Sequence, residues 1–262
     1  MLLILSPILC LCTGCAVNPI TGEEELMLFS TEQDIEIGRK YAPEVEKELG
    51  GRIANESLQN YIDSVGQKIA RIGHRPDWKY QFVAVQDKSL NAAALPGGYI
   101  FITKGMLENL QTEAQLAAIL AHETVHVVAR DTLNVMSNQI GISILLSAVT
   151  SAETSQGVST AANLARMIVG LRYSRNDERE ADLGGLDYMV AAGYNPYGMV
   201  ETMQTLQSQH EVRPIEFLSS HPSPENRIAY LMQRAQTNYA NIERLKIGKE
   251  DYHSNVLAQL KD

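Results

Sequence analysis

Two histidines and a glutamate in the stretch AHETVHVVARD have the types and spacing that metal chemistry requires. His122 and His126 are four residues apart, so on a helix both imidazoles project from one face and can bind one ion. Glu123 adjoins the first histidine, beside the coordination position that a catalytic zinc keeps open. The spacing predicts one zinc ion per chain, with His122 and His126 as ligands and Glu123 as the general base.

A catalytic zinc needs a third protein ligand, and the body of the chain has no cysteine to supply it. The segment YSRNDEREADLGG offers three carboxylates, those of Glu178, Glu180 and Asp182. Glu178 and Asp182 are four residues apart and share a helix face, whereas Glu180 points elsewhere. We therefore expect Glu178 to be the third ligand. Asp182 is then expected to orient a zinc-bound histidine, His122, through its other ring nitrogen.

The element that must position the histidines is a helix over residues 112–131. Thr112 and Gln115 form a capping-box pattern that predicts its first turn. The flanking sequence LAAILAHETVHVVA is apolar on most sides, so this helix is expected to be buried. Polar side chains in such surroundings need partners, and a shared cation provides one.

The remaining sequence predicts further helices around a small sheet. Apolar residues at helical spacing predict helices over 30–49 and 56–72, and β-branched and aromatic residues predict strands over 79–85 and 97–103. The intervening residues 86–96 are interpreted as a loop, and 150–160 as a mobile loop. Later helices are expected over 161–171, 174–192, 196–210 and 224–238. The apolar stretch 140–149 is too short to cross a bilayer and is expected to pack in the core or in a helical hairpin.

Composition excludes several classes of function. The chain has 262 residues and a formal net charge of −9, which argues against a nucleic-acid binder and against electrostatic attraction to an anionic membrane. Cys10, Cys12 and Cys15 all lie within the first fifteen residues. The rest of the chain therefore has no thiol for a disulfide or for a metal site.

The amino-terminal residues predict a lipid-anchored protein of the cell envelope. Residues 1–15 combine an apolar run with Thr13-Gly14-Cys15, which resembles a bacterial lipobox. They are interpreted as a signal peptide ending at an acylated Cys15, which anchors the chain in the bilayer. Ala16 favours the outer membrane, with the protein on the periplasmic side. Residues 16–29 are expected to be a tether and residues 30–262 the folded domain; the alternative is that the apolar run is a buried strand or helix.

Several motifs together resemble one family of enzymes. They are His122-Glu123-x-x-His126, Glu178-x-x-Ala181-Asp182, Ser219-Ser220-His221-Pro222 and the segment from Asn91 to Gly98. This set is similar to the zinc metallopeptidases of family M48, which include HtpX and the CAAX prenyl endopeptidase. Over residues 30–238 the chain looks most like the bacterial periplasmic lipoprotein branch with its BepA-like quality-control proteases.

The resemblance implies a fold and additional site residues. It implies a predominantly helical α+β domain of the zincin-like (gluzincin) type, with a small β-sheet whose edge strand flanks the active-site helix. Gly97, Gly98, Tyr99, Ile100 and Phe101 would form the edge to which an extended polypeptide substrate adds.

His221 and Arg227 receive roles only from this resemblance. Alone, both would be interpreted as surface residues. In the family setting, His221 would lie near the zinc, either supporting the oxyanion or holding the enzyme latent as a fourth ligand. Arg227 would help to hold that loop or the substrate.

These features predict an endopeptidase of envelope proteins that are misfolded or unassembled. Glu123 would act as general base on a zinc-bound water. The alternative is a lipid-anchored chaperone or binding protein that keeps zinc as a structural element without turnover. A third possibility is a zinc hydrolase that acts on a small amide. The chaperone or binding-protein alternative depends on whether His221 closes the fourth coordination position of the zinc.

Overall fold

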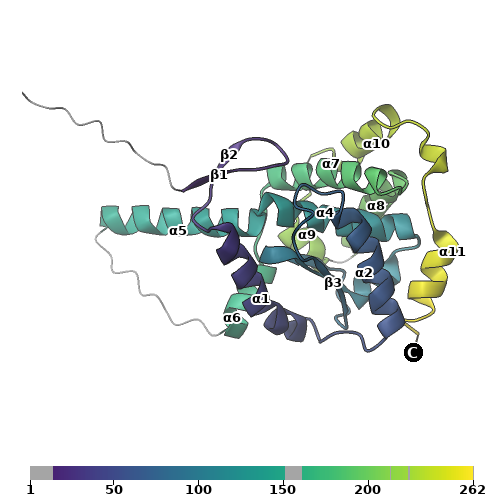
Figure 1. The fold of residues 1–262 in the computed structure, drawn as a ribbon, viewed down its shortest axis with the longest axis horizontal. Coiled ribbons are helices and arrows are strands. Elements are labelled where there is room, and N and C mark those ends of the chain that lie inside the picture. Colours follow the sequence, from purple (N-terminus) through teal and green to yellow (C-terminus); the bar gives the residue numbers. More distant parts are fainter. Residues whose placement is uncertain (1–13, 151–160, 213, 224, 262) are drawn as a thin grey trace, which may run out of the picture.

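The computed structural model describes residues 14–150, 161–212, 214–223 and 225–261. The expected signal peptide, up to residue 13, and all but the first residue of the loop expected over 150–160 lie outside the described residues. The described chain is mainly helical with two small sheets, which confirms the predicted α+β class (Figure 1).

The helices follow the predicted order closely. They are α1 (Thr31–Glu48), α2 (Glu56–Ala70), α3 (Lys104–Asn109), α4 (Glu113–Ala129), α5 (Asp131–Thr150), α6 (Ala161–Val169), α7 (Arg175–Ala191), α8 (Tyr197–Val212), α9 (Glu216–Ser220), α10 (Arg227–Thr237) and α11 (Lys249–Tyr252). The short helices α3, α9 and α11 were not predicted individually. The strands are β1 (Cys15–Val17), β2 (Glu24–Leu26), β3 (Gln81–Val85), β4 (Ala92–Leu95) and β5 (Tyr99–Thr103).

Helix α4 lies at the centre of the molecule and is buried along its whole length. Helices α2, α7 and α8 pack around it, and β4 lies against it. Thr112 caps the helix by accepting a hydrogen bond from the Gln115 backbone N–H at 3.2 Å. The side chain of Gln115 accepts from the Gln111 N–H instead of from Thr112. The predicted start of the helix is correct, while the reciprocal half of the cap is displaced by one residue.

The larger sheet corrects one expectation about the substrate edge. Its strand order is β3-β5-β4, with β5 parallel to β3 and antiparallel to β4. Strand β5 is therefore central, and its backbone is hydrogen-bonded on both sides, so Tyr99, Ile100 and Phe101 cannot form a free edge. Gly97 and Gly98 lie in the preceding 3-10 turn, Pro96–Gly98. The strand beside α4 is β4, formed by residues that the sequence analysis assigned to a loop.

The segment expected to be a tether is folded onto the body. Strands β1 and β2 pair as an antiparallel hairpin, and Asn18 and Met27 are buried. Asn18 donates hydrogen bonds to Glu25 at 2.8 Å and to Glu180 of α7 at 2.7 Å. Residues 16–29 are therefore ordered by tertiary contacts, although their proline, glycine and three consecutive glutamates are typical of a linker.

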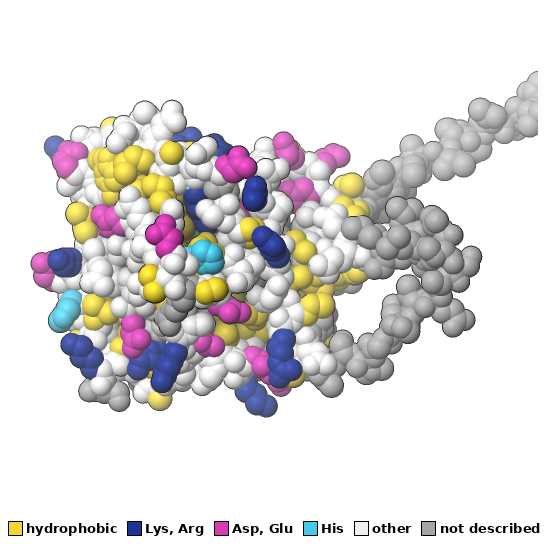
Figure 2. Space-filling model, turned by 180° about the vertical axis from the view of Figure 1, so that it is seen from behind, with side chains coloured by type: hydrophobic (Ala, Val, Ile, Leu, Met, Phe, Trp, Pro, Cys, Tyr) yellow, Lys and Arg dark blue, Asp and Glu magenta, His cyan; other side chains and the backbone are white. Residues whose placement is uncertain are grey.

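Beside this hairpin, α5 projects from the body as one long helix (Figure 1). Its apolar second half was expected to pack in the core or in a helical hairpin. Among the described residues, we find no helix with both the length and the apolar character needed to cross a bilayer. On the face shown in Figure 2, acidic and basic side chains are interspersed, in keeping with the exclusion of a basic nucleic-acid-binding surface.

Candidate metal centre

Three side chains of α4 point into the interior beside α7. His122 and Glu123 are fully buried and His126 is 1% exposed. Helix α7 approaches closely because it carries Gly185, where a Cβ would lie only 3.0 Å from the backbone nitrogen of His122. The glycine therefore allows carboxylates of α7 to reach the histidines of α4.

The chain turns directly after α4 and brings a carboxylate back to His126. Arg130 has a left-handed conformation, with φ 66° and ψ 33°, which is uncommon for a residue other than glycine. The turn places Asp131 so that His126 Nδ1 donates a hydrogen bond to its Oδ2 at 2.6 Å. With Nδ1 protonated, His126 Nε2 keeps its lone pair for a metal.

Helix α7 supplies two carboxylates from one face. Ser174 and Asp177 form a capping box at its start. Asp182 accepts a hydrogen bond from His122 Nδ1 at 3.1 Å, which leaves His122 Nε2 free to bind a metal. Glu178 lies 3.5 Å from Nε2 of His122 and 3.5 Å from Nε2 of His126.

Two side chains of helix α10 contact these carboxylates. Arg227 donates to Asp182 Oδ1 at 2.6 Å and lies 3.4 Å from Glu178 Oε2, and it is almost fully buried. The hydroxyl of Tyr230 donates to the other oxygen of Asp182. Arg227 was expected to hold the His221 loop or the substrate. Its contacts with Glu178 and Asp182 instead indicate that it positions these two side chains.

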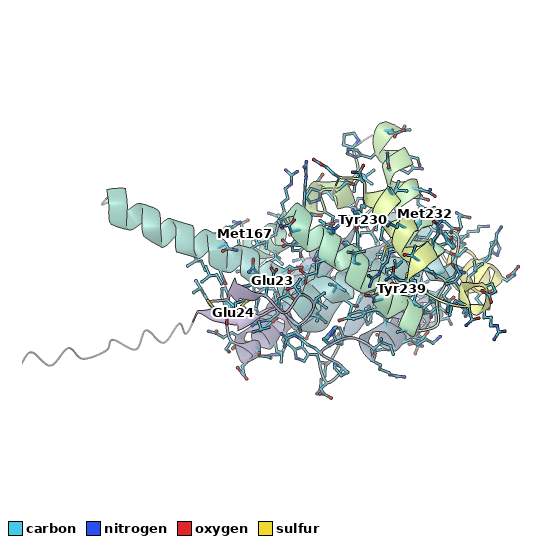
Figure 3. The ribbon with its side chains drawn as sticks, turned by 90° about the horizontal axis from the view of Figure 1, so that it is seen from above. Glu23, Glu24, Met167, Tyr230, Met232 and Tyr239 are labelled. Carbon is cyan, nitrogen blue, oxygen red and sulfur yellow. The ribbon has the colours of Figure 1, made fainter. Side chains whose placement is uncertain are left out.

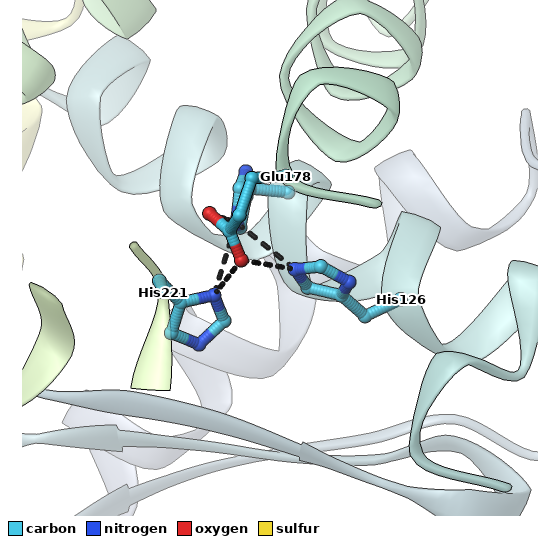
Figure 4. A group of neighbouring side chains, drawn as sticks. His126, Glu178 and His221 are labelled. Carbon is cyan, nitrogen blue, oxygen red and sulfur yellow. Dashed lines mark hydrogen bonds and ion pairs between the residues drawn. The ribbon is translucent and has the colours of Figure 1, made fainter. Parts of the chain in front are cut away.

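His221 reaches the same cluster from the end of α9. Its ring stacks on Phe217 at a centroid distance of 4.4 Å, and its backbone N–H donates to the Phe217 carbonyl. His221 Nδ1 lies 2.8 Å from Glu178 Oε1 (Figure 4). It also lies 3.3 Å from His122 Nε2. A residue that would be assigned to the surface on its sequence alone is therefore buried against the expected ligands.

The four possible ligand atoms lie within 4.8 Å of one another, and their shortest separations are similar to the edges of a tetrahedral zinc site. The two Nε2 atoms of His122 and His126 are 3.1 Å apart, and the other separations given above range from 2.8 to 3.5 Å. Four ligands at about 2.0–2.1 Å from a zinc ion lie about 3.3 Å from one another. Glu178 Oε2 is buried without a hydrogen-bond partner in the described part of the chain, as expected for an atom that binds a metal.

Glu123 lies beside the cluster without forming a hydrogen bond. Both of its carboxylate oxygens are buried and lack partners among the described residues. The Nε2 atom of His221 lies 3.7 Å from Glu123 Oε1. A buried, unsatisfied carboxylate is costly to the fold, and such groups concentrate where they have a chemical use.

The surroundings of His126 and Glu178 shift both pKa values in the direction that favours a positively charged imidazole beside an ionised carboxylate. Burial lowers the pKa of His126, but hydrogen bonds to Asp131 and Glu178 raise it well above its usual 6.5. Burial raises the pKa of Glu178, but His221, His122 and His126 together hold that pKa well below 4.5. The carboxylates thus stabilise a cation among the imidazoles.

The structure brings together His122, His126, Glu178, Asp182, His221 and Arg227, with Glu123 beside them. Asp131 was not predicted as a site residue, although it is the last residue of the stretch AHETVHVVARD. Tyr230 and Tyr173 were not predicted either. The ring of Tyr173 stacks on that of His126 at a centroid distance of 4.1 Å. The spacing of Asp131 from His126 offered a weak signal, whereas Tyr173 approaches from a distant segment and offered none.

Comparison with known proteins agrees with this geometry. The model of peptidase family M48 matches residues 56–235. The beta-barrel assembly-enhancing protease of Escherichia coli is 26% identical over 231 residues, covering 83% of this chain and 47% of its own. A counterpart from Vibrio cholerae is 30% identical over 192 residues, which are 68% of this chain and 39% of its own.

Similarity extends to a mitochondrial protein. The mitochondrial metalloendopeptidase OMA1 of Schizosaccharomyces pombe is 30% identical over 216 residues, covering 80% of this chain and 63% of its own. The chain spans less than half the length of the two bacterial relatives above.

Proposed function

Because this chain belongs to peptidase family M48, we propose that it is a zinc-dependent endopeptidase that hydrolyses peptide bonds in polypeptides of the cell envelope. The observation that carries this proposal is the juxtaposition of two features of the centre. Four possible ligand atoms lie within 4.8 Å of one another, and the buried carboxylate of Glu123 beside them has no hydrogen-bond partner among the described residues. A structural zinc site has no use for such a carboxylate.

His122, His126 and Glu178 would hold the zinc, and the bound ion would act as a Lewis acid that polarises the scissile carbonyl and activates water. Glu123 takes a proton from the water while the water oxygen adds to the carbonyl carbon. As the carbon–nitrogen bond breaks, Glu123 passes that proton to the leaving amine. Asp131 and Asp182 keep the two imidazoles oriented through their Nδ1 atoms.

We assign the substrate edge to β4. It is an outer strand of its sheet and lies against α4, so an extended polypeptide could add to its free side by main-chain hydrogen bonds. Ala92, Ala93, Ala94 and Leu95 are all buried in the present conformation. A substrate can therefore add to β4 only if the segments that cover these four residues move away.

His221 would hold the enzyme latent in this conformation. Its Nδ1 has the separations expected of a fourth ligand, and its Nε2 faces Glu123. A four-coordinate zinc has no position for water or substrate. The same geometry supports the alternative, a zinc-stabilised chaperone or binding protein in which His221 closes the site permanently.

Activity of the full chain separates the two alternatives. The wild type and the His221→Ala variant are assayed for zinc content and for casein cleavage. A latent peptidase predicts stoichiometric zinc in both and faster cleavage by His221→Ala. Zinc in both proteins with no cleavage by either would favour the binding protein.

For location, we propose a lipoprotein anchored through an acylated Cys15, on the periplasmic side of the outer membrane. The lipobox-like Thr13-Gly14-Cys15 and the exposed position of Cys15 support this placement. The protein names of the bacterial relatives refer to β-barrel assembly, which is compatible with a substrate among envelope proteins.

A further inference from the structure

The hairpin that follows the lipid-attachment residue leaves no flexible spacer. Cys15 is the first residue of β1, and β1 pairs with β2 from that residue onward. Leu28 donates its backbone N–H to Ser137 of α5 at 3.0 Å, and Asn18 binds Glu180 of α7. A disordered tether over residues 16–29 would let the body move by about 20 Å. The folded hairpin instead holds the body directly at the anchor.

One face of this hairpin carries exposed apolar side chains, with Glu24 at its turn end. Cys15 and Val17 alternate with Ala16 and so point to the same side of β1, and Cys15 pairs with Leu26. Val17 is 57% exposed and Leu28 is 42% exposed. The other side of the hairpin, which carries Ala16, Glu25 and the buried Met27, faces the body.

The apolar face continues onto α5. Leu26 packs near Gly141, where a Cβ would lie 3.5 Å from Leu26 Cδ2, and the adjacent Ile140 is 40% exposed. The sequence from residue 140 to 149 is IGISILLSAV, almost without polar groups. Figures 1 and 3 both place the hairpin, marked in Figure 3 by Glu23 and Glu24, beside the base of the projecting α5.

We propose that this surface, formed by Cys15, Val17, Leu26, Leu28 and Ile140, lies on the lipid bilayer and fixes the orientation of the protein. The inference rests on the proposed acylation of Cys15, because the acyl chains bring the membrane to the start of β1. Val17 is two residues away and thus within about 7 Å of the anchor along an extended strand. Because the hairpin is bound to α7, docking also fixes the orientation of the helix that carries Glu178.

The contact is apolar and not electrostatic. Glu23 and Glu24 lie at the hairpin turn and are exposed, and Glu24 pairs with Val17. Anionic headgroups would repel these carboxylates. Docking should therefore be stronger on zwitterionic phosphatidylcholine vesicles than on vesicles rich in phosphatidylglycerol.

Lipid quenching of a single tryptophan tests the surface in the full acylated chain. Leu28→Trp and Val17→Trp are made separately in a Trp78→Phe background and reconstituted in phosphatidylcholine vesicles with or without dibrominated acyl chains. The control is Ile247→Trp in the same background. Ile247 is 53% exposed and lies at the amino-terminal end of α4, about 25 Å from the end that contacts residues 29–30.

We expect brominated lipid to remove most of the fluorescence of the Leu28→Trp and Val17→Trp proteins and to leave that of Ile247→Trp unchanged. If the protein floats with the vesicles but none of the three is quenched, the chain is anchored and this surface does not touch lipid. Equal quenching of all three would also overturn the proposed orientation. If the protein does not float with the vesicles, the proposed acylation of Cys15 is contradicted, and so is the docking surface that rests on it. Casein cleavage would be unaffected in that case.

Discussion

Single residues determine which imidazole nitrogen is available to a metal. Asp182 accepts the Nδ1 proton of His122, and Asp131 accepts that of His126. The role of Asp182 was predictable because residues four apart on a helix share a face. That of Asp131 was not, because it depends on the left-handed turn at Arg130, which no residue pattern announces.

The orienting role of Asp131 predicts a loss of zinc affinity on truncation. Asp131→Ala should weaken zinc binding by about 10–100-fold, because outer partners of metal-bound histidines typically contribute that much. Competition with a chromogenic chelator measures the affinity. Asp187→Ala, which removes a partly exposed carboxylate of α7 that pairs with Arg234, is the matched control. An unchanged affinity in Asp131→Ala would show that the hydrogen bond does not act on the metal.

Helix α1 connects the end of α4 to the turn between β4 and β5. Asp34 accepts hydrogen bonds from Arg130 Nε at 2.8 Å and from the Gly97 backbone N–H at 2.6 Å. The sequence predicted α1 and two strands correctly from their periodicity. It did not predict β4, because an alanine-rich run has little strand propensity, and pairing with β5 overrides that preference.

The close approach of α1 to this turn makes Gly38 indispensable. A Cβ on Gly38 would lie 1.9 Å from the carbonyl oxygen of Pro96, so α1 or the turn must shift. We expect Gly38→Ala to lower the free energy of unfolding by about 1–3 kcal/mol, as measured by urea denaturation. In Gly141→Ala, the new Cβ makes only an ordinary contact and alanine favours the helix. A Gly38→Ala protein as stable as Gly141→Ala would contradict this packing.

The first turn of α4 is joined to the carboxy-terminal segment through Glu113. Burial raises the pKa of Glu113, but hydrogen bonds from Lys246, Tyr61 and Tyr194 outweigh it and hold the pKa below the usual 4.5. Ionised Glu113 therefore stabilises the fold above pH 4.5, and this contribution is lost as the pH falls through the lower pKa of the folded state.

Replacement of Glu113 should reproduce this pH dependence. Glu113→Gln should be less stable than the wild type by about 2 kcal/mol at pH 7, since hydrogen bonds to a charged group are lost. The difference should shrink as the pH is lowered below 4.5. Denaturation series at several pH values measure it, with the half-exposed Glu108→Gln as control. A pH-independent difference would contradict the role of the charge.

Over the whole molecule, the helical α+β class and most helix positions were predictable from apolar periodicity. The docked hairpin was not, because Asn18 is buried by Glu180, which lies 162 residues away. The proline, the glycine and the three glutamates of residues 16–29 are typical of linkers, and only the tertiary partner shows otherwise. His221 joins the metal centre for the same reason, since α9 and α10 bring its loop to α4 and α7.

A shared ion among α4, α7 and the His221 loop should stabilise the entire fold. Removing zinc with a chelator should lower the melting temperature, because an ion present at a thousand times its Kd contributes about 4 kcal/mol. The melting temperature should return when zinc is restored. Calorimetry of the full chain provides the measurement, and identical melting with and without zinc would exclude a shared ion.

The most direct measurement is the rate of casein cleavage by the zinc-loaded His221→Ala protein, with and without Glu123→Gln. Removing His221 opens the site, so that only the general base distinguishes the two proteins. We expect His221→Ala to cleave casein and the double variant to bind zinc equally but to be slower by about 10²–10⁴-fold. Equal cleavage by both would contradict the assignment of Glu123 as the general base.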